Sequence, residues 1–156
     1  MRMIQGCFQP ILVVLLAACT TATAPVPPAA GGTDALAQVG RWRLQGATDA
    51  QGARIDAAFP GGTAVHVLAF DDGTVSVEGG CNRIGGTYRI DAQGRLVVGP
   101  LRSTRMACAE TGLMAADDAV SALVQGTSAW RIAESWPEQL FVDHADGRRS
   151  QWVAAR

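Results

Sequence analysis

The sequence contains no lysine, because all thirteen of its basic residues are arginine. This absence excludes chemistry that depends on a lysine amine, such as Schiff-base formation or the lysine of a Walker-type phosphate loop. Together with fourteen acidic residues, the thirteen arginines give the chain a formal net charge of −1. Proteins that bind nucleic acid usually carry a clustered basic excess, so we expect no nucleic-acid partner.

The first nineteen residues have the order of an export signal. Arg2 supplies a positive start, and the apolar run over 11–16 is too short to span a bilayer as a helix. Small residues then precede Cys19, and this arrangement resembles the bacterial lipobox, in which the cysteine is acylated and becomes the mature N-terminus. We predict a lipoprotein signal peptide over 1–18 and lipidation of Cys19. An ordinary secretory signal or an uncleaved anchor is the alternative.

The next stretch is rich in Pro, Ala, Thr and Gly and has no charge or aromatic ring over 21–32. Such a composition cannot build a core, so we predict a flexible tether over 19–37 and a folded domain over 38–156. Thr20, rather than an aspartate, follows the acylated cysteine, which is typical of outer-membrane lipoproteins. We therefore expect an envelope protein, lipid-anchored to the outer membrane and facing the periplasm.

Cysteine is also scarce, with four residues in the chain. Cys7 would leave with the signal peptide and Cys19 would carry lipid, so only Cys81 and Cys108 remain in the folded part. An even pair of cysteines in an exported chain most often forms a disulfide. A bridge here would close a loop of about 28 residues, which the chain-entropy model values at roughly 3 to 4 kcal/mol.

Apolar and polar residues alternate with a period of two in many short runs, which is typical of half-buried strands. The clearest runs are 64–70, 74–78, 87–90, 95–98, 130–132, 140–142 and 151–153. Asp and Gly residues between several of these runs favour tight turns. We read the two Asp-Ala-Gln-Gly stretches, at 49–52 and 91–94, as such turns, because neither supplies the oxygens of a dedicated calcium loop.

One segment departs from this pattern and has apolar residues at helical spacing. The apolar stripe comprises Leu113, Ala116, Val120, Leu123 and Val124. We assign Asp117 and Asp118 to the opposite, polar face. The predicted fold class is α+β: mostly antiparallel β, as a curved sheet or partly open barrel of about seven to nine short strands, with one helix near 111–125 packed on it.

Two sequence blocks in the folded part form a recognisable motif. The first is Cys-Asn-Arg-Ile-Gly-Gly-Thr-Tyr over 81–88, and the second is Thr-Arg-Met-Ala-Cys over 104–108, just before the helical segment. The motif residues are Cys81, Asn82, Arg83, Gly86, Thr104, Met106 and Cys108. With them, the sequence resembles the META-domain (HslJ-like) family. The resemblance covers about residues 38–154. It implies a compact β-rich domain, often found in small envelope lipoproteins and in some cases associated with stress responses, with no established catalytic activity.

Catalytic and metal-binding readings of Cys81 are weaker. A cysteine nucleophile needs a nearby base, and the chain has only His66 and His144. We expect His66 to be a packed or edge residue in the middle of a strand and His144 to be exposed beside a turn. A zinc site from these histidines with Cys81 and Cys108 would lack a short-spaced ligand pair. A dinucleotide loop would need a helix directly after the glycine pairs around Cys81, and none is predicted there.

We therefore expect a monomeric, non-catalytic protein without cofactor or metal, acting in envelope maintenance or stress tolerance. Its expected partners are the membrane, through lipid on Cys19, and an envelope protein or small ligand. Arg83 and Arg105 are the candidate binding residues if they lie on one rim. The alternatives are a module that binds one small molecule and an inhibitor-like domain that acts on an envelope enzyme.

Overall fold

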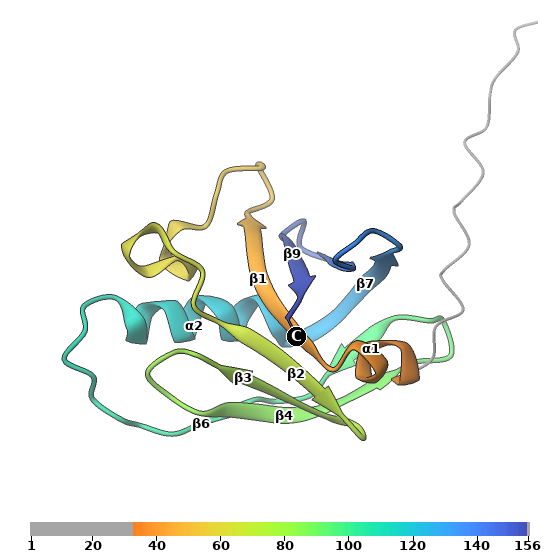
Figure 1. Ribbon diagram of the computed structural model, residues 1–156, viewed down its shortest axis with the longest axis horizontal. Helices are drawn as coiled ribbons and strands as arrows, with labels where there is room; N and C mark the ends of the chain where they lie inside the picture. The colour runs from red at the N-terminus through yellow and green to blue at the C-terminus, as the bar shows by residue number, and fades with distance from the viewer. Residues whose placement is uncertain (1–32, 156) are drawn as a thin grey trace, which may run out of the picture.

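Nine antiparallel strands account for most of the fold in the computed structural model, which describes residues 33–155 (Figure 1). The strands are β1 (Arg41–Thr48), β2 (Val67–Asp71), β3 (Thr74–Glu78), β4 (Ile84–Ile90), β5 (Leu96–Val98), β6 (Arg102–Ser103), β7 (Gly126–Ala133), β8 (Gln139–His144) and β9 (Arg149–Ala154). The helices are α1 (Thr33–Val39) and α2 (Leu113–Val124), with two short 3₁₀ turns, η1 (Asp56–Ala58) and η2 (Pro60–Gly62). The predicted fold class, including the helix near 111–125, is confirmed.

Eight of these strands close into a barrel. Their order is β3-β2-β1-β9-β8-β7-β5-β4, and the pairing of β3 with β4 joins the two ends. The two-residue strand β6 pairs with the beginning of β4, where β5 does not reach. Closure removes the two free edges that an open sheet of these eight strands would have, so that the outer side of β6 is the edge left at this end of β4.

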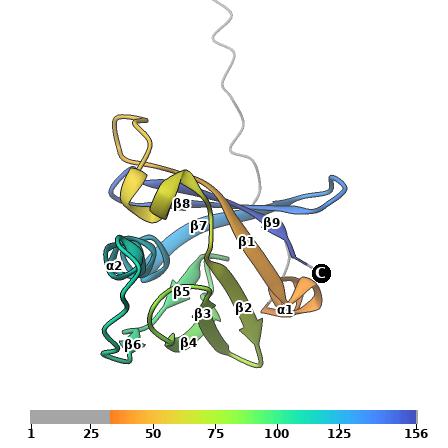
Figure 2. The same ribbon diagram turned by 60° about the vertical axis from the view of Figure 1, so that its left-hand side comes forward.

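Helix α2 covers one end of the barrel. That end collects the β1–β2, β3–β4 and β8–β9 connections, because neighbouring strands run antiparallel. The helix directs Val120, Leu123 and Val124 into the core. In Figures 1 and 2, α1 lies on the opposite side of the barrel from α2.

The barrel interior follows the period-two pattern of the strands. In β1, Trp42 and Leu44 are buried while Arg41 and Arg43 are exposed. Trp152 of β9 lies beside Leu44 in the ladder and is also fully buried. Large apolar side chains from neighbouring strands thus fill the barrel, as the alternation predicts.

Helix α1 was not expected, since its residues fall partly in the range predicted as a tether. Leu36 is nevertheless fully buried, and Trp42 donates a hydrogen bond from Nε1 to the Leu36 carbonyl at 3.3 Å. The folded unit therefore begins at least five residues before residue 38. The helix is only seven residues long, too short to show helical periodicity in the sequence.

The signal peptide, Cys19 and the tether up to residue 32 lie outside the described residues. Between residues 33 and 155, none of the helices has both the length and the apolar character needed to cross a bilayer.

The role of α1 is testable with Leu36→Ala. Removing a fully buried leucine side chain should lower the free energy of unfolding by about 2 to 4 kcal/mol, because a cavity remains at the end of the barrel. The matched control is Gln38→Ala on the exposed side of the same helix, which should change stability by less than about 0.5 kcal/mol. Chemical denaturation of both variants measures the difference. Equal stabilities would show that α1 is not part of the cooperative unit.

Candidate functional site

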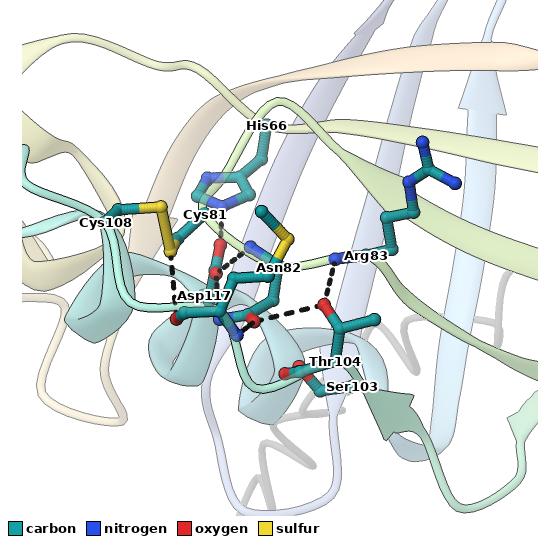
Figure 3. Close-up of a disulfide and its surroundings, with 9 residues drawn as sticks. His66, Cys81, Asn82, Arg83, Ser103, Thr104, Cys108 and Asp117 are labelled. Atoms are coloured by element: carbon teal, nitrogen blue, oxygen red, sulfur yellow. Dashed lines mark hydrogen bonds and ion pairs between the residues drawn. A yellow bond between two sulfur atoms is a disulfide. The ribbon is translucent and has the colours of Figure 1, made fainter.

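The two family blocks meet at the α2 end of the barrel through a disulfide between Cys81 and Cys108 (Figure 3). Their Cα atoms lie 5.8 Å apart. The bridge ties the β3–β4 loop to the segment that leads into α2, so the predicted pairing is present. Because Cys81 is buried, the bridge forms part of the packed end of the domain rather than an exposed clip.

Asn82 joins three segments through its side-chain amide. Its Oδ1 accepts hydrogen bonds from the Met106 backbone N–H at 2.8 Å and from Thr104 Oγ1 at 3.1 Å. Its Nδ2 donates to Asp117 Oδ2 at 3.1 Å. One amide group therefore holds the β3–β4 loop, the segment after β6 and helix α2 together.

Arg83 and Thr104 extend the pairing between the same two segments. The Thr104 N–H donates to the Arg83 carbonyl at 3.1 Å, and the Arg83 N–H donates to Thr104 Oγ1 at 3.1 Å. These bonds use the backbone of Arg83 and leave its guanidinium directed away from the network (Figure 3). The two blocks are about twenty residues apart in the sequence, but they lie side by side in one structural unit.

Asp117 is the centre of this unit, which corrects its assignment to the polar face of the helix. Its side chain is only 3 % exposed. Its Oδ2 accepts from the Asn82 N–H at 2.7 Å as well as from the Asn82 amide, and its Oδ1 lies 2.9 Å from His66 Nε2. The spacing contained the signal: residue 117 follows Leu113 by four and precedes Val120 by three, so it belongs to the buried stripe.

His66 lies immediately before β2 and is fully buried. Of the two expectations for this residue, packed or at an edge, the packed one is correct, although His66 lies just before the strand rather than in its middle. The sequence did not reveal its bond to Asp117. Its second nitrogen, Nδ1, is buried and has no hydrogen-bond partner among the described residues. Burial of the pair keeps His66 away from substrates in solvent.

Two glycines near Cys81 lie in close contact with neighbouring residues. A Cβ at Gly80 would overlap Asp117 Oδ1 and come within 2.6 Å of His66 Nε2. A Cβ at Gly86, a family-motif residue, would approach Leu101 Cδ2 to 3.0 Å. Glycine at position 80 therefore allows the loop to lie directly on the buried carboxylate.

His144 is buried, contrary to the expectation that the adjacent turn exposes it. It is the last residue of β8, with its side chain directed inward, and its Nδ1 lies 2.9 Å from Ser128 Oγ. Burial lowers the pKa of the His144 imidazole below its ordinary value, and the positive charge of Arg148 lowers it further. Its turn is exposed, but the strand alternation places the imidazole on the inner face.

Two hollows open at the surface beside the disulfide. One, of about 780 Å³, includes Arg83 in its lining, and the other, of about 510 Å³, includes Arg105. Asn82, Thr104 and Met106 border both hollows. The two arginines thus line separate hollows on the two sides of a shared ridge, rather than one common pocket.

This geometry suits a rigid scaffold. Both described cysteines are joined in the disulfide, so neither provides a thiolate nucleophile. Over residues 33–155, no group of three or more His, Cys, Asp or Glu side chains is placed to hold a metal ion. The hydrogen-bonding groups of Asn82 and Asp117 are directed into the fold, and the side chains left for external contacts are those around the two hollows.

The fold and site define a class of proteins: small closed antiparallel barrels, capped by one helix that a disulfide-linked loop holds in place. The META domain family matches residues 34–156, and the chain belongs to this family.

Two solved structures are similar. An NMR structure of a protein from Burkholderia xenovorans shares 25% sequence identity with a TM-score of 0.67, over 91% of this chain and 99% of that one. A second NMR structure has 20% identity and a TM-score of 0.52, over 78% of this chain and 93% of that one, and supports the fold alone. No curated protein matches the chain significantly.

The central role of Asp117 is testable by comparing Asp117→Asn with Asp118→Asn, the same chemical change at adjacent positions. The amide at position 117 replaces one acceptor oxygen by a donor that faces other buried donors. We therefore expect the free energy of unfolding to fall by about 2 to 4 kcal/mol. Asp118 is exposed, and its replacement should change stability by less than about 0.5 kcal/mol. Urea denaturation measures both. Similar effects at the two positions would contradict the central role of Asp117.

The lowered pKa of His144 predicts a pH dependence of stability. The unfolded chain binds a proton at His144 more readily than the folded one does. The contribution of His144 to the free energy of unfolding is therefore complete above about pH 6.5 and is lost as the pH falls below that value. His144→Gln should flatten the stability profile between about pH 7 and pH 5. Asp91 also has a lowered pKa, but aspartates titrate below this range, so Asp91→Asn should leave the slope unchanged. A slope that persists in His144→Gln would refute the assignment.

Proposed function

We propose that this protein is a lipid-anchored, extracytoplasmic META-domain protein without catalytic activity, which acts in envelope maintenance or stress tolerance by binding a partner protein. The observation that carries the proposal is the arrangement around Asn82. Its amide and the carboxylate of Asp117 stabilise the disulfide-linked loop, and this loop presents exposed side chains around two hollows.

The extracytoplasmic part of the proposal is supported by the disulfide and the N-terminal sequence. Disulfides persist mainly in oxidising compartments such as the periplasm, and Cys81 is joined to Cys108. The lipobox-like residues before Cys19 supply an independent reason to expect export. More than one acyl chain makes anchoring stable, since each buried methylene contributes about 0.8 kcal/mol.

A protein partner fits the surface better than a small ligand does. The larger hollow, of about 780 Å³, falls within the size range of ligand pockets. However, many of its lining residues are themselves exposed, including Glu78, Gly79, Arg83, Thr104 and Met106. A ligand there would keep much of its surface in water, whereas a protein could cover the hollow and its rim together.

The anchor is testable by replacing Cys19 with serine in the full chain. Acylation requires the thiol, so Cys19→Ser should move the protein from the membrane fraction to the soluble extracytoplasmic fraction. Cys7→Ser is the matched control and should stay with the membrane, because Cys7 lies inside the predicted signal peptide. Separation of inner and outer membranes by density, followed by immunoblotting, measures the partition. Unchanged membrane association of Cys19→Ser would refute lipidation as its cause.

A further inference from the structure

The outer edge of β6 is an unpaired strand edge beside the disulfide site. Because the Thr104 N–H bonds to the Arg83 carbonyl, residues 83 and 104 form a hydrogen-bonded pair. Ile84 and Ser103 are the next partners in the register and therefore form a pair without mutual hydrogen bonds. The backbone N–H and C=O groups of Ser103 point away from β4, and those of Arg105 follow the same alternation.

Nothing in the described part of the chain bonds to these outward groups. On the same edge, the Leu101 N–H donates to the side chain of Gln125, the residue directly after α2, with its Oε1 at 3.2 Å. Beyond Leu101, every residue from 102 to 107 is exposed. An edge of this kind is the surface on which an extended peptide adds as a further strand.

A hollow beside this edge leaves room for the side chains of such a strand. The hollow of about 510 Å³ is bordered by residues 103–107 on one side and by Met114 and Asp118 of α2 on the other. Met106 and Met114 are 56 % and 51 % exposed, respectively, although they are large and apolar. Methionine is flexible and polarisable, and it is common on surfaces that bind peptides.

The charges on the outer face of the edge are positive. Residues 83, 85, 102 and 104 share one face of the β4–β6 pairing, so Arg83 and Arg102 are near neighbours there. Neither guanidinium has an ion pair or hydrogen bond within the described residues. Asp118 is the one acidic side chain that lines the hollow, and Arg105 lines it too.

From these observations we infer that β6 binds an extended segment of a partner protein by strand addition. The segment carries acidic residues near Arg83 and Arg102 and apolar residues near Met106 and Met114. The inference rests on the proposed binding function and names the chemistry of the partner. The shortness of β6 and the positive charges of Arg102 and the neighbouring Arg83 discourage pairing with arbitrary chains. A complementary segment is therefore favoured.

A second copy of this chain fits the edge less well. In the antiparallel register centred on Ser103, Arg102 of one copy would be the diagonal neighbour of Arg102 of the other, within reach of a long side chain. Like charges at such short range repel each other. An acidic segment reverses the sign of this interaction, and its affinity should fall as the salt concentration rises.

The test is selection of binders from a random library of eight-residue peptides, using the full chain in detergent micelles. Selected peptides should be enriched in both acidic and apolar residues. Ser103→Pro removes the outward N–H but no inward bond, so it should weaken their binding at least about tenfold, as expected for a lost hydrogen bond and a blocked edge. Ser103→Ala is the matched control, since it also lacks the hydroxyl but keeps the N–H, and it should bind within about twofold of the original protein.

Amide hydrogen exchange gives a second readout in the same complexes. A bound strand should slow exchange at Ser103 and Arg105, whereas Thr104, already bonded to Arg83, should change little. The strand-addition inference is overturned by recovery of no peptide, by selection of basic peptides, or by equal binding to Ser103→Pro and Ser103→Ala.

The same variants separate this inference from the proposed function. Co-purification from envelopes tests whether the mature protein has a partner at all. A partner that Ser103→Pro retains as well as Ser103→Ala does would preserve the binding function and refute strand addition at β6. Absence of any co-purifying partner, together with peptides that bind as described, would refute the proposed partner complex and retain the edge as a peptide-binding site.

Discussion

The carboxylate of Asp117 is the interaction on which the α2 end of this barrel depends. It is almost completely buried and accepts hydrogen bonds from the backbone and side chain of Asn82, while its other oxygen contacts His66. A buried carboxylate is costly unless such donors surround it. The residue before β2, the β3–β4 loop and helix α2 must therefore keep their relative positions, because any separation would leave the charge unsatisfied.

The disulfide and the carboxylate constrain the same loop by different physical means. The bridge from Cys81 to Cys108 restricts the unfolded chain and joins the loop to the segment before α2. The hydrogen bonds of Asn82 then select one orientation of that loop among those the bridge permits. Gly80 completes the arrangement, since only a residue without a side chain leaves space for Asp117 and His66 against the loop. The family motif is thus the local sequence of one packed unit.

Much of the barrel was predictable from sequence because strand alternation is local information. The alternating runs, the α2 segment and the cysteine pair could all be recognised. The network around Asp117 could not be recognised, because its contacts join Asp117 to Asn82, which lies 35 positions earlier in the sequence, and to His66, which lies 51 positions earlier. Asp117 was assigned to the exposed face because it is polar, although its spacing places it within the apolar stripe. His144 was misassigned for a related reason: the turn beside it is exposed, whereas the strand alternation directs its imidazole inward.

Helix α1 and the disulfide site lie at opposite ends of the barrel. The chain enters the barrel through α1 at one end, and the disulfide, both hollows and the edge of β6 lie towards the opposite end, with α2. The length of the barrel therefore acts as a spacer between the point of entry and the exposed groups of the site. The proposed attachment upstream of α1 would leave the far end accessible, so the proposed anchor and the proposed binding surface would not overlap.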